Sequence, residues 1–293
     1  MAEEFRGIVP AIITPFTADG QVNEDAYRQV VEFNVKAGVH GFWVCGGTGE
    51  GVLLSDDERI RIAEVSADQV RGRAKVIMHV GATTTQSAVR IAKGAGAAGV
   101  DAICSVPPLP YRPDDGAIVA HYRAIAEATD LPFFVYNLPQ MTGVEVTPPL
   151  MERLVKEVPH ITGMKHSAPN FFNIYAFNRL GMAVFTGNSG LLLPALTMGA
   201  VGCVDGPPNM APEVHVEIYN AYQEGDIEKA EEGQRRACAV KELCSRFTFI
   251  AVIKAVLSER LGVDCGVPRP PIRSLTRDER RQVIRRAKEL GIV

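Results

Sequence analysis

The stretch Ile161-Thr162-Gly163-Met164-Lys165 is a short apolar run that closes on a lysine, a pattern typical of a buried strand that gives way to a loop. Helical segments with recognisable starts, such as the capping box at Ser55, separate runs of this kind along the chain. Eight strands, each followed by a helix, predict a (β/α)₈ TIM barrel. The expected strands cover residues 8–14, 41–45, 75–80, 102–106, 131–136, 161–165, 183–187 and 201–204.

The strand pattern ends near residue 212, and the apolar residues beyond it have helical spacing. We therefore predict that residues 1–211 form the barrel. Residues 212–293 are expected to form a C-terminal helical extension that includes the last barrel helix, with prolines at 268, 270 and 271 before its final helix. Expected helix starts are Asn23, Ser55, Asp114, Thr147 and Thr276, and the expected tail helices cover residues 214–222, 227–244, 249–261 and 276–290.

The composition is that of an ordinary globular protein with a sizeable core: 293 residues, of which 46% are hydrophobic and 22% charged. A formal net charge of −3 gives no basic excess, so we expect no nucleic-acid partner. No stretch resembles a membrane span and residues 1–5 lack the features of a signal peptide, so a cytoplasmic protein without a membrane partner is expected. The six cysteines include no Cys-x-x-Cys pair and are expected to be small core residues.

Three strand ends carry residues suited to carbonyl chemistry. A lysine at a barrel mouth, such as Lys165, can form a Schiff base when its amine is neutral. The glycine-rich turn Gly46–Glu50 offers backbone N–H groups and the Thr48 hydroxyl to a carboxylate, and Tyr136 can serve as general acid and base. Each has a structural alternative: an exposed lysine, a structural glycine turn, a core tyrosine. Because active sites of this fold lie at the carboxyl ends of the strands, we expect all three at one mouth.

A metal-dependent aldolase is the first enzymatic alternative, because it needs His, Asp or Glu ligands clustered at strand ends. The sequence offers Glu50, His79, His166 and Asp205, which have no tight ligand spacing. They are more typical of caps, buried hydrogen-bonding residues and loops. We predict that the chain has no metal site.

Taken together and in order, these motifs resemble those of the dihydrodipicolinate synthase and N-acetylneuraminate lyase superfamily, the pyruvate-dependent class I aldolases. The resemblance covers essentially the whole chain. It rests on PAIITPF at residues 10–16, the Gly-Thr-Gly-Glu turn, Tyr136-Asn137-Leu138-Pro139 with Thr142-Gly143, Gly163-Met164-Lys165, and Gly199-Ala200-Val201-Gly202.

The resemblance implies a Schiff base between Lys165 and the ketone of pyruvate or another 2-oxo acid. It places Thr48 and nearby backbone amides on the carboxylate and makes Tyr136 the proton carrier. The protonated imine is an electron sink, which lets an enamine form and attack an aldehyde, or lets a carbon–carbon bond break in reverse. The implied partners are a small-molecule 2-oxo acid and an aldehyde. The covalent imine on Lys165 makes a metal or organic cofactor unnecessary, and the family's usual assembly is a homotetramer.

The chain departs from the family's patterns at positions that choose the substrate. Met141 stands where dihydrodipicolinate-forming members have an arginine for the second substrate's carboxylate, and a thioether cannot form that bidentate pair. Gly47 replaces a hydroxyl residue. Pro110 occupies the place of a tyrosine that neighbouring subunits exchange; either Tyr111 next to it substitutes or the relay lacks this member. The loop at Gly187 has none of the acidic side chains with which sialic acid lyases hold sugar hydroxyls.

We predict a Schiff-base-forming class I lyase that acts on pyruvate or a 2-oxo-3-deoxy acid. Its pocket is expected to be weakly polar, because of Met141, Leu109, Pro207 and Pro208, and to suit a hydrophobic or small neutral aldehyde. The alternatives are a 4-hydroxy-tetrahydrodipicolinate synthase of lysine biosynthesis, a sugar-acid dehydratase of the same superfamily, and a non-catalytic 2-oxo-acid-binding protein. The predicted catalytic residues are Lys165 and Tyr136, and the predicted substrate-binding residues are Gly47, Thr48, Tyr111, Met141, Gly187 and Val204.

Overall fold

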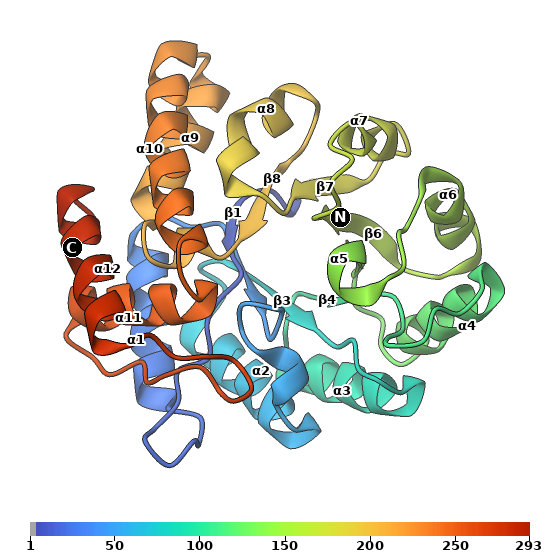
Figure 1. Cartoon of the computed structure of the whole chain (residues 1–293). Coiled ribbons are helices and arrows are strands. Elements are labelled where there is room, and N and C mark those ends of the chain that lie inside the picture. Colours follow the sequence, from blue (N-terminus) through green and yellow to red (C-terminus); the bar gives the residue numbers. More distant parts are fainter. Residues whose placement is uncertain (1–3) are drawn as a thin grey trace.

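The computed structural model describes residues 4–293, and at its centre eight parallel strands form a barrel (Figure 1). The strands are β1 (Gly7–Pro10), β2 (Gly41–Val44), β3 (Lys75–His79), β4 (Ala102–Ser105), β5 (Phe133–Asn137), β6 (Ile161–His166), β7 (Ala183–Thr186) and β8 (Gly202–Asp205). β1 pairs with β8 at one side. At the other side Ala11 bridges Trp43, and the Ile12 N–H donates to Trp43 O at 3.1 Å, which closes the ring between β1 and β2. The TIM-barrel prediction is confirmed.

Helices cover the outside of the barrel, at least one after each strand (Figure 1). They are α1 (Glu24–Lys36), α2 (Asp56–Val70), α3 (Thr85–Ala98), α4 (Asp115–Ala126), the short α5 (Pro139–Thr142), α6 (Pro148–Glu157), α7 (Asn173–Asn178), α8 (Leu192–Thr197) and α9 (Pro212–Glu224). Side chains at the predicted starts accept hydrogen bonds from the first turns of their helices, and Ser55 forms the full capping box with Glu58. These predicted helix starts are confirmed.

After α9, the C-terminal extension continues with α10 (Ile227–Ser245), α11 (Phe249–Leu261) and α12 (Arg277–Glu289), which gather on one side of the barrel beside α9 and α1 (orange to red in Figure 1). The predicted start of α12 at Thr276 is confirmed by a second capping box. The segment between α11 and α12 returns to the barrel, where the Arg269 guanidinium pairs with Glu58 of α2 at 2.8 Å. Within residues 4–293, every helix is too short or too polar to cross a membrane.

The core has two parts, because alternate residues of each strand face opposite sides of the barrel wall. One cluster lies between the strands and the surrounding helices. The other fills the barrel interior with Val9, Trp43, Ile77, Phe134 and Phe185, together with Val204. This inner cluster forms the floor beneath the carboxyl ends of the strands.

The cysteines follow the prediction with one exception. Cys45, Cys104, Cys203, Cys244 and Cys265 are buried, but Cys238 is exposed. It lies on α10, where its thiol donates to Gly190 O at 3.4 Å. The expectation that all six are core residues is therefore wrong for Cys238, which is exposed on α10 beside Gly190.

Candidate active site

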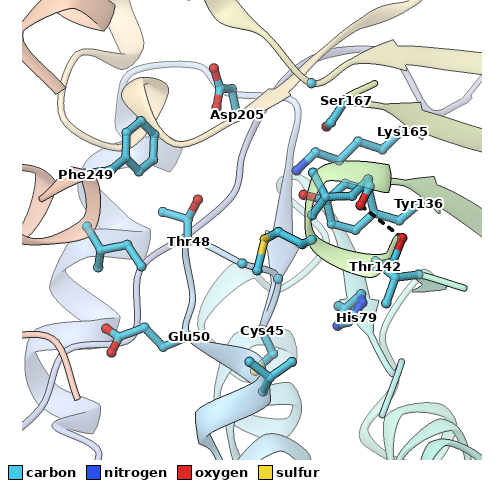
Figure 2. Close-up of a pocket in the computed structure, with 18 of the residues that line it drawn as sticks. Cys45, Thr48, Glu50, His79, Tyr136, Thr142, Lys165, Ser167, Asp205 and Phe249 are labelled. Atoms are coloured by element: carbon cyan, nitrogen blue, oxygen red, sulfur yellow. Dashed lines mark hydrogen bonds between the residues drawn. The ribbon is translucent and has the colours of Figure 1, made fainter. Parts of the chain in front are cut away.

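A cavity of about 470 Å³ lies at the carboxyl ends of the strands (Figure 2). Residues at or just beyond the ends of β2 to β8 line it, together with Phe249, Ile250 and Ile272 of the C-terminal extension. Most of the wall surface is apolar, and the polar side chains that line it include those of Thr48, Tyr136, Lys165, Ser167 and Asp205. This is the composition expected of a small-molecule site, in which a few polar groups orient a ligand within an apolar enclosure.

Lys165 projects from β6 into the cavity and is 4% exposed, which excludes the alternative of a solvated strand-end lysine. It is in register with Tyr136 on β5, and its Nζ lies 4.2 Å from the centroid of the Tyr136 ring and 5.4 Å from that of Trp43. Within residues 4–293, no carboxylate oxygen lies within 4 Å of this amine. The Lys165 amine therefore lies in the cavity beside two aromatic rings. Among the described residues it has no carboxylate partner that would compete with a carbonyl substrate.

The position of the Tyr136 side chain is set by packing of its aromatic ring. The ring meets the edges of Trp43 and His79, with centroid separations of 5.6 and 6.0 Å, and the residue is 5% exposed. Its hydroxyl makes no hydrogen bond to any of the residues that the structure describes, whereas the neighbouring Thr142 hydroxyl donates to Leu138 O at 3.1 Å. The phenol is thus free to bond to a ligand beside Lys165.

The turn Gly46–Glu50 follows β2 and places Gly47 and Thr48 on the cavity wall. The Glu50 N–H donates to Gly47 O at 3.1 Å, and the Thr14 hydroxyl donates to Gly49 O at 2.7 Å. Glycine is required at Gly51, because a Cβ there would lie 1.8 Å from Cys45 O. These contacts fix the conformation of the turn, and Gly47 and Thr48 face the space that a ligand would occupy.

Asp205 is a site residue that the sequence analysis considered only as a metal ligand. It ends β8, lines the cavity, and accepts hydrogen bonds from the N–H and hydroxyl of Ser189, both at 2.9 Å. Lys241 of α10 pairs with it at 2.7 Å. Burial raises the pKa of this carboxyl, but Lys241 and the backbone N–H groups of Ser189 and Gly206 outweigh burial and hold it below its ordinary value.

His79 lies behind Tyr136 and is kept neutral by its surroundings. Burial, and then the charge of Arg59, holds the pKa of His79 well below its ordinary value. Arg59 donates to the His79 carbonyl and contacts its Nδ1 at 3.4 Å. None of the residues 4–293 forms a group of three or more potential metal ligands. Of the four metal-ligand candidates, Glu50 and Asp205 instead form ion pairs, and His79 and His166 form hydrogen bonds.

The structure brings most of the predicted site residues to this one cavity. Lys165, Tyr136, Gly47, Thr48, Met141 and Gly187 all line it, as does Leu109.

Four other expected residues lie elsewhere. Val204 is fully buried in the barrel interior, one residue short of the mouth, and Asp205 takes the place at the cavity. Tyr111 is 84% exposed in the loop after β4 and is not among the lining residues. Pro207 and Pro208 are buried in a short 3₁₀ turn after β8 and are not among the lining residues.

Comparison with known proteins places the chain in a family. The model of the dihydrodipicolinate synthetase family matches residues 4–290. The chain belongs to this family. It is 33% identical to a 4-hydroxy-tetrahydrodipicolinate synthase of Methanopyrus kandleri over 297 residues, covering 100% of this chain and 99% of the relative.

Two solved structures of family members share the fold over nearly the full length. YagE, a prophage protein of E. coli K12 solved in complex with pyruvate, has a TM-score of 0.94 and 26% identity, with 99% of each chain covered. The N-acetylneuraminate lyase of Proteus mirabilis has a TM-score of 0.92 and 25% identity, again with 99% of each chain covered. The prediction of a Schiff-base-forming class I lyase of this superfamily is confirmed.

Proposed function

We propose that Lys165 forms the Schiff base with the ketone of pyruvate or another 2-oxo acid, that Gly47 and Thr48 bind its carboxylate, and that Tyr136 carries protons. The observation that carries this proposal is the placement of Lys165 Nζ at 4.2 Å from the Tyr136 ring, in the cavity, without a carboxylate partner among residues 4–293. The proposal includes no metal and no organic cofactor, because the imine itself supplies the electron sink.

The chemistry follows from these positions. The neutral Lys165 amine attacks the ketone carbon. The resulting hydroxyl takes a proton from solvent and leaves as water, which gives the protonated imine. Tyr136, as phenolate, removes a proton from the adjacent carbon, and the electron pair moves to the iminium nitrogen to give an enamine. The enamine carbon attacks the aldehyde carbon while the Tyr136 phenol gives its proton to the aldehyde oxygen. Water then hydrolyses the protonated imine, which releases the product ketone and the neutral Lys165 amine and returns one proton to solvent. The reverse sequence cleaves a 2-oxo acid.

The walls of the cavity favour an apolar acceptor. Met141, Leu109, Phe249, Ile250 and Ile272 all line the cavity, so an acceptor beside Lys165 would meet mainly apolar side chains. We therefore propose a hydrophobic or small neutral aldehyde. The identity of 33% to a 4-hydroxy-tetrahydrodipicolinate synthase favours that activity as the second candidate, against which stands the absence of an arginine at Met141.

Assembly and location complete the proposal. We propose a cytoplasmic homotetramer. Exposed aromatic rings support association between chains: Tyr111 is 84%, Phe172 64% and Tyr175 45% exposed. Aromatic side chains are enriched at protein–protein interfaces. In such an assembly the exposed Tyr111 is available to a neighbouring subunit.

The test is reduction with borohydride after incubation with pyruvate, followed by intact mass measurement and peptide mapping. A pyruvate-sized adduct confined to Lys165, and absent from Lys165→Ala, is the expected result. Turnover should be unchanged by a chelator. If neither pyruvate nor larger 2-oxo acids leave an adduct, the lysine does not react and the proposal fails.

A further inference from the structure

The C-terminal extension reaches the active site through a buried ion pair. Lys254, in the middle of α11, places its Nζ 2.6 Å from Oε1 of Glu50, and the two side chains are 1% and 0% exposed. The same Nζ donates to Val267 O at 3.1 Å and lies 4.2 Å from the centroid of the Phe16 ring. Helix α11 thus holds the last residue of the turn Gly46–Glu50.

Arg269 holds the same residue from a second direction. Its backbone N–H donates to Glu50 Oε2 at 2.6 Å, and its guanidinium donates to Leu53 O at 2.8 Å. Both oxygens of the Glu50 carboxylate are therefore engaged by residues of the extension. Glu50 itself has φ of 58°, a left-handed conformation that a non-glycine residue keeps only where its surroundings fix it.

The strained residue is coupled to the groups that face the cavity. The Glu50 N–H donates to Gly47 O at 3.1 Å, and the Gly51 N–H donates to Gly46 O at 3.1 Å. Gly47 and Thr48 lie within this hydrogen-bonded turn, so a displacement of the Glu50 carboxylate moves them as well. Figure 2 shows Glu50 directed away from Lys165 and Thr48 lying beside the cavity.

We infer that Lys254 is a positioning residue for the carboxylate of the substrate: through Glu50 it fixes the place of Gly47 and Thr48. This inference rests on the proposed function, which assigns the carboxylate to those two residues. Lys254 does not line the cavity and touches no reacting atom. A role confined to stability would differ, because replacing both members of a buried ion pair by neutral residues can restore stability without restoring the geometry that the pair imposed.

The experiment compares Lys254→Met, Glu50→Gln and the double variant. For each, the pyruvate concentration that gives half of the maximal borohydride-trapped adduct is measured beside the melting temperature. We expect Lys254→Met and the double variant to raise the half-saturating concentration about tenfold or more, since small displacements of positioning groups have large effects. At saturation the adduct should still map to Lys165. The double variant should recover melting temperature, because it leaves no buried charge unpaired.

Arg273→Met is the matched control, since the Arg273–Glu279 pair belongs to the same extension but has side chains 57% and 23% exposed. It should keep the wild-type half-saturation. If the double variant has both the melting temperature and the half-saturation of the wild type, the pair only stabilises and the inference is overturned. If Lys254→Met does not fold, the half-saturating concentration of the double variant alone tests the inference. A wild-type protein that traps no 2-oxo acid would instead refute the proposed function.

Discussion

At the scale of single residues, a substitution of Tyr136 should affect activity without affecting stability. Its ring packs against Trp43 and His79, while its hydroxyl has no hydrogen-bond partner within residues 4–293. Tyr136→Phe should therefore change the free energy of unfolding by no more than about 0.5 kcal/mol. It should lower kcat by about 10²–10⁴-fold through loss of the proton carrier, while Lys165 still forms the trapped imine. Steady-state kinetics and urea unfolding check both, and an unchanged kcat would exclude this role.

Met141 offers a test of acceptor choice at one position. It is 64% exposed at the cavity wall, so a longer side chain fits there without displacing the core. Met141→Arg adds a bidentate donor for a carboxylate and should raise kcat/KM for aspartate semialdehyde about tenfold. Met141→Leu is the control and should leave this ratio near that of the wild type. Equal ratios for both variants would show that position 141 does not contact the acceptor.

The residues to which the proposal assigns chemistry were predictable because each closes or closely follows an apolar run. Lys165, Tyr136 and Thr48 stand at or just beyond strand ends, where the barrel turns side chains toward its mouth. Asp205 carries the same signal, because it directly follows the apolar run that ends with Val204, but Val204 was the residue predicted to bind substrate. The predicted strand ended one residue too early. Neighbouring side chains of a strand point in opposite directions, so an error of one residue selects a side chain of the barrel interior, Val204, in place of one that lines the cavity, Asp205.

At the scale of elements, the 3₁₀ turn after β8 joins the first and last strands. Asn209 Oδ1 accepts from the Ile13 N–H at 3.0 Å, and its Nδ2 donates to Ala11 O and Gly206 O, both at 2.8 Å. Asn209→Ala leaves these buried groups unpaired and should lower the free energy of unfolding by about 2–3 kcal/mol in urea denaturation.

Asn178→Ala is the comparison for this prediction. The Asn178 side chain makes one hydrogen bond, from Nδ2 to Gly199 O at 2.7 Å, in a part-buried position. Its loss should be smaller, about 1 kcal/mol. If both variants lower the free energy of unfolding by the same amount, Asn209 does not contribute more than an ordinary hydrogen-bonded side chain to closing the barrel.

Helix starts were easier to predict than strand ends, for a physical reason. A cap is a local contact, as between Ser55 and Glu58, and sequence spacing encodes it directly. The end of β1 depends on distant partners: the expected strand continued to residue 14, but β1 ends at Pro10. Beyond Pro10, the backbone bonds instead to Trp43 and to the Asn209 side chain.

At the scale of the whole molecule, buried histidines make stability depend on pH. Burial lowers the pKa of His79, His166 and His215, and lowers that of His121 to about 4. In the unfolded chain a histidine titrates near pH 6.5, so below that pH the unfolded state binds more protons than the folded state. Stability should therefore be full above about pH 6.5 and fall toward pH 4, by at most about 1.4 kcal/mol per pH unit for each histidine.

Urea unfolding at pH 7, 6 and 5 measures this slope. His121→Gln is the informative variant, because His121 is 5% exposed and its Nδ1 has one partner, the Thr85 hydroxyl at 2.9 Å. It should flatten the slope relative to the wild type. An identical slope in the variant would show that His121 does not titrate on unfolding.

The sequence did not predict where the C-terminal extension packs against the barrel. Its helices were predicted from their apolar spacing, and the structure has helices over the same ranges within a few residues. That Phe249, Ile250 and Ile272 form a cavity wall depends on contacts such as Arg269 with Glu50, which lie 219 residues apart in sequence. Periodicity describes how one element folds and carries no signal for such distant partners.

The position of that wall also sets an order of events during translation. When Asp205 leaves the ribosome, the nascent polypeptide holds all eight strands, but Lys254, Arg269 and Ile272 have still to be made. At about 5–20 residues per second, several seconds of elongation separate a complete barrel from a complete pocket. The nascent chain thus carries Lys165 before it has a finished site, and we expect it to become able to capture a 2-oxo acid only near the end of its synthesis.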